Sequence, residues 1–531
     1  MTNPPFPFRM PLLRSLAAAL ALAMSATASA APPARTVQLD LAAATKPMDR
    51  FFDLAVGADY PGTTGRPENL AQLKTTVDEL GFRYLRFHDI FHDVYGTVKK
   101  DADNKLVFDF SKIDQLYDAM LARGIKPFIE LGFTPGVMKT SDLKIFYWKG
   151  NTSHPQPGPW SELIDAFVRH LVQRYGIEEV RKWLFEVWNE PNLDGFWEKA
   201  DQKAYFELYA NTSRTIKKID AKLQVGGPAT AGAAWVPEFL AYAKANDVAV
   251  DFVTTHTYGV TEGFLDEFGK SDRILATDPN SIIGDIVRNR REIEASAFPG
   301  LPLYITEWST SYNPHDKVHD SYISAPWILQ KLVGTRGHAQ AMSYWTYSDL
   351  FEEPGPPNRA FHGGFGLMTR DGLRKPSWFA YKYLNALRGN EVTSTDKQLL
   401  AAVDGRKTAV VVWDWQHPDQ KTTSNGVFFA KPVPNGPAAA VTLNLRNVAA
   451  GSYRVRVHRT GHKTNDAYTA YLEMGAPKDL EPGQLTQLHA LTQDKPEVNR
   501  VVKVGQDGKL RWKLPMRSND VVLVTLEPAK K

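Results

Sequence analysis

The chain has 531 residues, with 63 Lys and Arg against 59 Asp and Glu, and 43% of its residues are hydrophobic. This length is enough for two or three domains with a large buried core. A net charge of +4 is too small for the dense basic surface of a typical nucleic-acid-binding protein. Because the chain contains no cysteine, disulfides, thiolate metal sites and cysteine nucleophiles are excluded. The 13 Trp, 20 Tyr and 27 Phe suit both core packing and ligand stacking, and we expect most of them in the core.

Residues 1–30 have the pattern of a secretory signal peptide. Two arginines precede an apolar run over 16–24, and Ala28-Ser29-Ala30 supplies small residues for cleavage by signal peptidase. A membrane-spanning helix needs about 20 apolar residues, and this run is shorter. We therefore expect an exported protein without a membrane anchor, in the periplasm or outside a bacterial cell.

Residues 45–388 alternate apolar, β-branched runs with longer stretches of helical periodicity, as repeated βα units do. The eight expected strands cover 52–58, 82–87, 126–132, 183–188, 223–227, 250–258, 303–307 and 341–347. The expected helices include 68–80, 111–123, 161–175, 202–219, 281–297 and 377–387. This pattern favours an α/β fold, a (β/α)8 TIM barrel. An open doubly wound sheet is the alternative, but no glycine-rich phosphate motif follows the first strand.

Residues 389–531 change to short alternating strands with almost no helical period. The expected strands cover 408–413, 440–445, 453–459, 501–504, 509–514 and 521–526. They predict a C-terminal all-β sandwich domain, and a strand over 36–41, which alternates in the same way, is a candidate to complete it. We favour a sandwich that covers apolar barrel surface over one that binds sugar.

Two segments end an apolar strand in a glutamate. Asn189-Glu190 follows the fourth strand and is broken at once by Pro191, and Glu307 ends the seventh strand before Trp308. In a barrel, both would face the catalytic end. Two carboxyl groups on one cavity are what glycosidic bond cleavage requires, because one donates a proton while the other stabilises positive charge at the anomeric carbon. Asn189 would bind a sugar hydroxyl beside the reacting carbon.

At these residues the chain resembles glycoside hydrolase family 39, a family of barrel enzymes with the acid/base on strand four and the nucleophile on strand seven. The resemblance extends to Tyr84-Leu85-Arg86-Phe87-His88, to His256-Thr257-Tyr258, to 343–349, and to 465–471 in the sandwich, and so covers nearly all of the mature chain. It implies a retaining double displacement with Glu190 as acid/base and Glu307 as nucleophile. Their carboxyl groups would then lie about 5 to 5.5 Å apart.

The resemblance also implies substrate-binding roles for Arg86, His88, Asn189, His256, Tyr258, Trp345 and Glu352. Arg86 and Tyr258 are expected to hydrogen-bond Glu307, although an interior ion pair of Arg86 with Glu130 or Glu186 is an alternative. His88 and His256 end their strands and are expected to donate to sugar hydroxyls. The Glu352 carboxylate, beside Glu353 in a loop, is the expected acidic hydroxyl ligand.

Three tryptophans, Trp188, Trp308 and Trp345, are expected at the rim of the sugar pocket, with Trp345 as the surface on which a sugar stacks. We expect no cofactor and no metal, since the histidines lack HExxH spacing.

The resemblance carries the choice of sugar. It favours a retaining exo-acting β-1,4-xylosidase that releases xylose from xylo-oligosaccharides, without a nucleic-acid or membrane partner. An α-L-arabinosidase, an α-L-iduronidase and an endo-acting polysaccharide hydrolase stay open, as does a carbohydrate-binding protein without catalysis. The sequence leaves the oligomeric state open.

Overall fold

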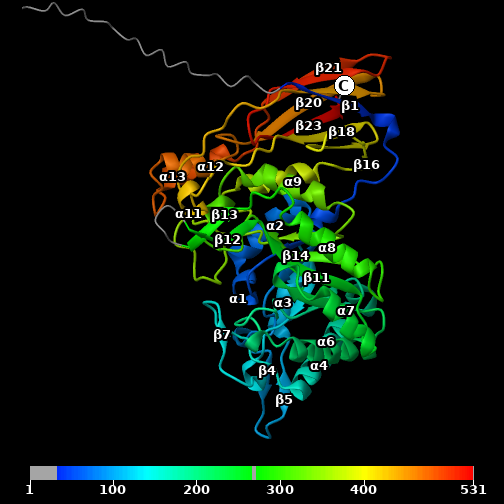
Figure 1. Ribbon diagram of the computed structural model, residues 1–531, viewed down its shortest axis with the longest axis vertical. Helices are drawn as coiled ribbons and strands as arrows, with labels where there is room; N and C mark the ends of the chain where they lie inside the picture. Colours follow the sequence, from blue (N-terminus) through cyan, green and yellow to red (C-terminus); the bar gives the residue numbers. More distant parts are fainter. Residues whose placement is uncertain (1–32, 266–270, 530–531) are drawn as a thin grey trace, which may run out of the picture.

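The computed structural model describes residues 33–265 and 271–529. The predicted signal peptide, 1–30, lies outside the described residues. The dominant feature is a closed barrel whose strands follow one another in sequence order (Figure 1). Its strands are β2 (Ala55–Gly57), β3 (Tyr84–Phe87), β6 (Lys126–Leu131), β9 (Leu184–Val187), β10 (Gln224–Thr230), β11 (Phe252–Tyr258), β14 (Leu303–Ser309) and β15 (Ala341–Tyr344). All eight neighbouring pairs are parallel.

All eight barrel strands fall within or across the predicted runs, and the (β/α)8 prediction is confirmed. The first strand is shorter than expected because Phe51–Asp53 forms a turn of 3-10 helix before β2. The seventh strand is longer, since β14 continues past Glu307 to Ser309. Glu307 therefore projects from a paired strand and not from a loop, which fixes its backbone.

The helices of the barrel region are α1 (Pro61–Thr64), α2 (Pro67–Leu80), α3 (Ser111–Leu121), α4 (Pro157–Tyr175), α5 (Ile177–Val180), α6 (Gln202–Ile219), α7 (Val236–Ala245), α8 (Ile283–Glu294), α9 (Ser324–Thr335) and α10 (Pro376–Asn385). Short 3-10 helices cover Leu41–Ala43, Phe51–Asp53, Asp93–Tyr95, Gly136–Met138, Glu198–Ala200, Ala231–Ala233 and Lys317–His319. Across 33–265 and 271–529, we find no helix long and apolar enough to span a membrane.

Local signals in the sequence explain where these helices begin and end. Helix α2 begins at Pro67, whose fixed φ suits the first turn, and ends at Gly81, which takes the left-handed conformation with φ 79°. Helix α6 begins after Asp201, whose side chain accepts a hydrogen bond from the amide of Ala204.

Three antiparallel hairpins lie in the connections of the barrel. They are β4 (Val98–Lys100) with β5 (Leu106–Phe108), β7 (Lys144–Ile145) with β8 (Gly150–Asn151), and β12 (Val260–Leu265) with β13 (Ser271–Leu275). The β7–β8 hairpin follows β6 and contributes to the cavity described below.

The C-terminal region forms two sheets at the other end of the molecule, in the upper part of Figure 1. One sheet has the order β16-β17-β18-β23-β20-β21, and the other β1-β19-β22. The bounds are β1 (Arg35–Asp40), β16 (Asn390–Glu391), β17 (Leu399–Asp404), β18 (Lys407–Trp413), β19 (Val441–Arg446), β20 (Gly451–Thr460), β21 (Val498–Val504), β22 (Leu510–Leu514) and β23 (Val521–Pro528). The N-terminal strand β1 pairs in parallel with β19, as its alternating pattern suggested.

This region is less purely β than expected, because it contains α11 (Asn425–Phe428), α12 (Ala467–Glu473) and α13 (Pro482–Leu491). Helices α12 and α13 lie between β20 and β21 and enclose a small separate core with Phe361 and Leu373. The expectation of almost no helix was wrong here. Helix α13 buries only Leu488 completely, so it lacks the apolar stripe by which an amphipathic helix is found.

The middle strands of the six-stranded sheet, β17, β18 and β23, are buried on both faces. In β18, Val410 and Val412 pack into the sandwich core, whereas Val411 and Trp413 pack into the same core as the barrel helices. This alternation follows directly from the two-residue period of a strand. The sandwich therefore covers apolar barrel surface.

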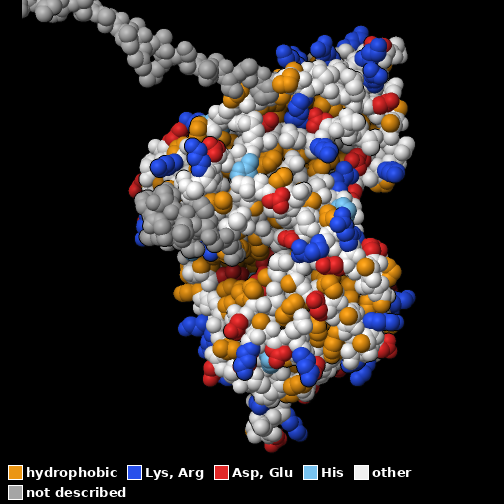
Figure 2. All heavy atoms as spheres, viewed as in Figure 1, with side chains coloured by type: hydrophobic (Ala, Val, Ile, Leu, Met, Phe, Trp, Pro, Cys, Tyr) orange, Lys and Arg blue, Asp and Glu red, His pale blue; other side chains and the backbone are white. Residues whose placement is uncertain are grey.

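Figure 2 shows one face of the molecule, on which Lys and Arg side chains are scattered among acidic ones. The described residues on this face form no continuous basic patch.

Candidate active site

The end of β9 positions the first carboxyl group. After Val187, residues Trp188 and Glu190 take positive φ angles of 71° and 46°, and the Glu190 amide donates to the carbonyl of Ala229 on β10 at 2.8 Å. The turn directs Glu190 over the mouth of the barrel. A non-glycine residue in this conformation carries local strain, which is common at functional sites.

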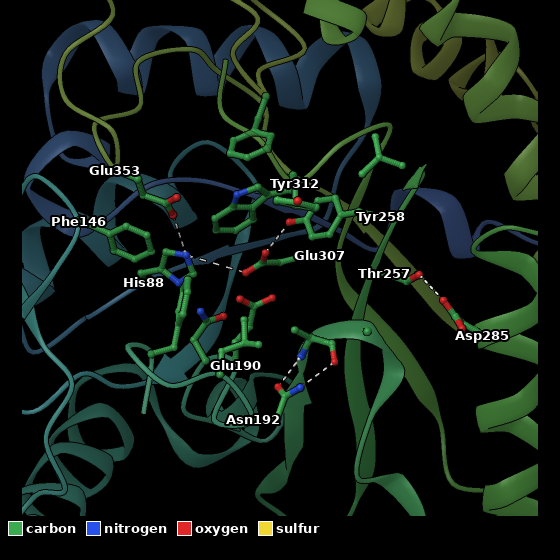
Figure 3. A pocket seen from close by; sticks show the side chains of 18 residues that line it. His88, Phe146, Glu190, Asn192, Thr257, Tyr258, Asp285, Glu307, Tyr312 and Glu353 are labelled. Carbon is green, nitrogen blue, oxygen red and sulfur yellow. Dashed lines mark hydrogen bonds and ion pairs between the residues drawn. The ribbon is translucent and has the colours of Figure 1, made fainter. Parts of the chain in front are cut away.

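A cavity of about 540 Å³ lies at the carboxyl ends of the strands (Figure 3). Its walls combine aromatic side chains with a few polar groups, as sugar-binding pockets do. The lining residues are His88, Phe146, Asn189, Glu190, Asn192, Leu193, Phe196, Ala231, Gly232, Thr257, Tyr258, Val260, Asp285, Glu307, Tyr312, Trp345, Glu353 and Phe365.

Glu190 and Glu307 lie close together in this cavity. One carboxylate oxygen of each and one ring nitrogen of His256 all lie within 4.8 Å of one another. Figure 3 shows the two carboxyl groups side by side. Inverting glycosidases separate their carboxyl groups by about 6.5 to 9.5 Å to admit a water molecule, whereas retaining enzymes hold them at about 5 to 5.5 Å. The short separation suits the retaining geometry.

Two donors hold the Glu307 carboxylate. Arg86 Nη1 donates to Oε1 at 2.8 Å, and the Tyr258 hydroxyl donates to Oε2 at 2.7 Å. Each donor binds a different carboxylate oxygen, so the two hydrogen bonds together fix the orientation of the Glu307 carboxyl group. Both contacts are those expected from the sequence.

The guanidinium of Arg86 also makes the interior ion pairs that were the alternative. Its Nε donates to Glu186, and its Nη2 lies 2.9 Å from both Glu130 Oε2 and Asn189 Oδ1. Arg86 is completely buried. Because Asn189 uses its carbonyl oxygen to accept from Arg86, its amide NH2 is left to donate into the cavity that it lines.

The surroundings of Glu190 differ from those of Glu307. Glu190 is 8% exposed, and burial raises its pKa to about 7, against the opposing positive charges of His88 and Arg86. Its Oε1 lies 2.9 Å from His256 Nδ1. Glu190 thus retains a proton near neutrality beside a carboxylate held by two donors.

His256 does not line the cavity, and the expectation that it donates to a sugar hydroxyl was wrong. Its side chain is fully buried, and its two ring nitrogens face Glu190 and Thr306. Burial lowers its pKa to about 4. The strand register is responsible, because β11 slips against β14 between Thr255 and His256 and turns this side chain behind the carboxyl groups.

His88 does line the cavity. Its Nδ1 lies 2.7 Å from Glu130 Oε2, and its Nε2 lies 3.0 Å from Glu353 Oε1. Burial disfavours the charged ring, but Glu130 and Glu353 outweigh this and raise the pKa of His88 well above its ordinary value. Burial in turn raises the pKa of Glu353 to about 8, against the hydrogen bond from His88.

The acidic residue of the loop after β15 that reaches the cavity is Glu353 and not Glu352. The Glu352 side chain points to Arg66, which donates to both of its carboxylate oxygens. The expected role of Glu352 is therefore corrected. Both glutamates stand in one loop without a period, so the sequence offers no signal for choosing between them.

Trp345 is the one of the three predicted rim tryptophans that lines the cavity. Its ring lies 4.8 Å from that of His88 and 5.7 Å from the Arg86 guanidinium. Trp188 and Trp308 are completely buried and do not reach the cavity. Trp308 stacks on Trp327 of α9, so in both cases core packing explains the aromatic residue.

Several cavity residues were not expected from the sequence. Phe146 comes from the β7–β8 hairpin and stacks on His88 with ring centres 5.7 Å apart. Asp285 accepts a hydrogen bond from Thr257 at 2.7 Å on the side away from Glu353 (Figure 3). Asn192 binds the backbone of Ala231 through both ends of its amide, which holds the loops after β9 and β10 together. Of these residues, Asn192 directly follows Asn189-Glu190-Pro191, and Thr257 lies between His256 and Tyr258.

Among the described residues, Glu190, His256 and Glu307 are the set whose donor atoms gather as metal ligands would. Arg86 already neutralises part of the negative charge at this point, and Glu190 retains a proton near neutrality. The set is better suited to moving a proton than to holding a cation.

A parallel eight-stranded barrel with two close carboxyl groups, from its fourth and seventh strands, defines a glycoside hydrolase. Comparison with known proteins identifies the family of glycoside hydrolases. The model of glycosyl hydrolases family 39 matches residues 35–511, and the chain belongs to this family.

The relatives cover almost the whole chain. A β-xylosidase of Geobacillus stearothermophilus is 35% identical over 488 residues, which are 90% of this chain and 93% of that protein. A crystal structure of the GH39 enzyme from Xanthomonas axonopodis pv. citri superposes with a TM-score of 0.93 at 61% identity, covering 94% of this chain and 98% of the other. A monomeric β-xylosidase from Caulobacter crescentus CB15 gives a TM-score of 0.92 at 63% identity, with coverage of 94% and 100%.

Proposed function

We propose that this glycoside hydrolase is a retaining β-xylosidase that releases xylose from the ends of xylo-oligosaccharides. The observation that carries the proposal is the pair of close carboxyl groups in unlike surroundings, with Glu190 protonated near neutrality and Glu307 held by Arg86 and Tyr258. The relatives described as β-xylosidases support the choice of sugar.

In the first step, Glu190 donates its proton to the leaving glycosidic oxygen while Glu307 attacks the anomeric carbon. The bond to the leaving oxygen breaks, and a covalent glycosyl ester forms on Glu307. In the second step, the ionised Glu190 takes a proton from water, which attacks the anomeric carbon and releases the sugar with its configuration retained. The raised pKa of Glu190 suits this change from acid to base.

The walls of the cavity favour an uncharged sugar. Among the described residues that line it, none is Lys or Arg, and the ring of His88 is already paired with Glu130 and Glu353. A uronic acid would therefore lack an unpaired cation for its carboxylate among them. The face of Trp345 suits the apolar face of a pyranose, and His88, Glu353 and the amide of Asn189 offer hydrogen bonds to its hydroxyls. These features favour xylose over iduronate.

One side of the cavity is bridged, which favours action at chain ends. The Tyr147 amide of the β7–β8 hairpin donates to the carbonyl of Glu353 at 2.8 Å and so joins the connection after β6 to the one after β15. In the barrel, β2 and β3 stand between these two strands. The bridge crosses the side where Glu353, Phe146 and His88 lie (Figure 3), and it would obstruct a polysaccharide passing through.

The proposal is tested with a panel of aryl glycosides that includes β-xyloside, α-arabinoside, β-glucoside and α-iduronide. We expect the highest kcat/KM with aryl β-xyloside and, by proton NMR, β-xylose as the first product. A first product of the α-anomer would refute double displacement, and preference for another glycone would refute the assignment of xylose.

Variants of the two glutamates assign the roles. We expect Glu307→Ala to lower activity by about 10⁴-fold or more, as happens when a covalent nucleophile is removed from an enzyme. Added azide should restore turnover and give an α-glycosyl azide as the product. Glu190→Gln should lose about 10²- to 10⁴-fold on poor leaving groups and much less on dinitrophenyl xyloside. Undiminished hydrolysis in either variant would remove that residue from its role.

We further propose that the enzyme is exported, on the grounds of the charged, apolar and small-residue pattern of residues 1–30. Expression of the full chain in a Gram-negative host should yield activity in the periplasmic or culture fraction and a mature N-terminus at Ala31. An uncleaved N-terminus in the cytoplasmic fraction would contradict export.

A further inference from the structure

Four buried side chains form a continuous row of hydrogen-bond contacts behind the cavity. They come from β9 and the turn after it, from β11 and from β14. Glu190 Oε1 lies 2.9 Å from His256 Nδ1, His256 Nε2 lies 3.1 Å from Thr306 Oγ1, and the Thr306 hydroxyl lies 2.8 Å from Glu186 Oε1. His256, Thr306 and Glu186 are fully buried. The row links the proposed acid/base to an interior carboxylate that does not face the substrate.

The chemistry at the Glu186 end fixes the direction of every hydrogen bond in the row. Glu186 is ion-paired with Arg86 and can only accept hydrogen bonds. Thr306 therefore gives its single hydroxyl proton to Glu186 and has only lone pairs for His256. His256 Nε2 must carry hydrogen to complete that contact.

The imidazole of His256 is neutral at the pH of interest, because burial lowers its pKa to about 4. A neutral ring with hydrogen on Nε2 presents a bare lone pair at Nδ1. The Nδ1 lone pair faces Glu190 at hydrogen-bond distance. This contact is a hydrogen bond only when Glu190 is protonated and donates to Nδ1.

We propose that Thr306 and His256 are positioning residues that keep the acid/base Glu190 protonated, Thr306 by fixing the tautomer of His256 and His256 by accepting a hydrogen bond from the protonated Glu190 carboxyl group. This inference rests on the proposed role of Glu190. It explains why His256 lies behind the carboxyl groups. A ring that offered hydrogen from Nδ1 would instead stabilise ionised Glu190, which cannot act as an acid.

Other charged or titratable groups surround Glu190 and His256, and any effect of a change at Thr306 adds to the effects of these groups. They are Arg86 of β3, His88 directly after β3, Glu130 of β6, Glu186 of β9, Tyr258 of β11, Glu307 of β14 and Glu353 of the loop after β15. A change at Thr306 that keeps its size leaves all of these in place.

The decisive variant is Thr306→Val, which keeps the shape and removes the hydroxyl. Nε2–H then loses its acceptor, and the tautomer that donates from Nδ1 to ionised Glu190 becomes competitive. We expect the alkaline limb of the kcat/KM profile on aryl β-xyloside to move down by about one pH unit, the size of one hydrogen bond to a charged group. Thr306→Ser should restore the wild-type limb.

Thr212→Val is the matched control. Thr212 in α6 is also buried and also accepts a ring N–H, from Trp160 Nε1 at 2.8 Å, but it lies outside the cavity. It should lose comparable stability and keep the wild-type pH profile. An alkaline limb that stays in place in Thr306→Val, or moves equally in Thr212→Val, would overturn the proposal.

Two measurements do not depend on turnover, and they separate failure of this inference from failure of the proposed function. Nitrogen-15 NMR of histidine-labelled wild-type enzyme should show His256 with hydrogen on Nε2, assigned by its loss in His256→Asn. Carbon-13 titration of labelled glutamate, assigned with Glu190→Gln, should show a lower Glu190 pKa in Thr306→Val. Hydrogen on Nδ1 in the wild type would refute the inference even if Thr306→Val does not fold.

Discussion

The hydroxyl of Tyr258 donates a hydrogen bond to Oε2 of Glu307 at 2.7 Å. Burial, with the nearby Glu307 and Glu190 charges, raises the pKa of Tyr258 well above its ordinary value, so the phenol keeps its proton throughout the working range. The contact therefore acts at every pH at which the enzyme works.

Tyr258→Phe should lower kcat/KM by roughly 10- to 100-fold, because a hydrogen bond to a charged group contributes about 1.5 to 3 kcal/mol. Steady-state kinetics on aryl β-xyloside measure the loss. An unchanged kcat/KM would show that the hydrogen bond from Tyr258 to Glu307 does not assist the reaction.

Arg86→Met should reduce the free energy of unfolding by about 3 to 5 kcal/mol, because it leaves buried carboxylates without their cation. Arg86 contacts Glu130, Glu186 and Glu307 from a fully buried position. Denaturant unfolding followed by tryptophan fluorescence measures the effect. Arg169→Met is the control, since its ion pair with Asp165 is exposed to solvent and should contribute little to stability. Equal losses in the two variants would contradict a special role for burial.

The free energy of unfolding should fall as the pH rises from 6.5 to 8.5. Burial raises the pKa of Glu190 to about 7 and that of Glu353 to about 8. In the folded protein each of these carboxyl groups keeps its proton at pH values at which the unfolded chain has already lost it. The free energy of unfolding therefore falls as the pH rises through these values. His88, whose pKa is also raised, acts in the same direction above its ordinary pKa. Urea titrations at both pH values test this.

Glu353→Gln should flatten that dependence, since the amide does not titrate. A double change of Glu190 and Glu353 to Gln should flatten it further. Stability that rises toward pH 8.5 would contradict the assignment of these protons.

The paired glutamates of the loop after β15 offer a matched test of substrate binding. Glu353→Ala should raise KM and lower kcat/KM by roughly 10- to 100-fold, because it removes an acceptor for a sugar hydroxyl and a partner of His88. Glu352→Ala should leave both constants near wild type, since it breaks only the pair with Arg66 at the protein surface. The opposite result would restore Glu352 as the hydroxyl ligand.

The barrel and the pair of close carboxyl groups could be predicted because both follow from the pattern of apolar runs in the sequence. Buried parallel strands are continuous apolar runs, and the carboxyl groups stand where two of these runs stop, at Glu190 and Glu307. The contacts of Arg86 and Tyr258 with Glu307 were expected from the resemblance to the family, and the structure contains both.

The loop residues could not be predicted, since no period relates them to the barrel. Phe146 enters the cavity from a hairpin, and the choice between Glu352 and Glu353 depends on which way one loop turns. The predicted rim positions of Trp188 and Trp308 were wrong for another reason. A tryptophan beside a catalytic residue suits a core position as well as a rim, and only packing distinguishes the two.

The last prediction concerns the contact between sandwich and barrel, where Trp413 is completely buried in the barrel-side core and its ring nitrogen donates to Gln330 of α9 at 3.4 Å. Trp413→Ala should cost about 3 to 5 kcal/mol of unfolding free energy, as large-to-small changes of buried aromatics do. Because one core joins the two parts, we expect them to unfold in a single calorimetric transition that shifts to lower temperature in the variant. KM should not change, since Trp413 does not line the cavity. Trp415→Ala, two residues further and only partly buried, should shift the transition less. Two separate transitions, with the barrel melting at the wild-type temperature, would show that the sandwich does not stabilise the catalytic domain.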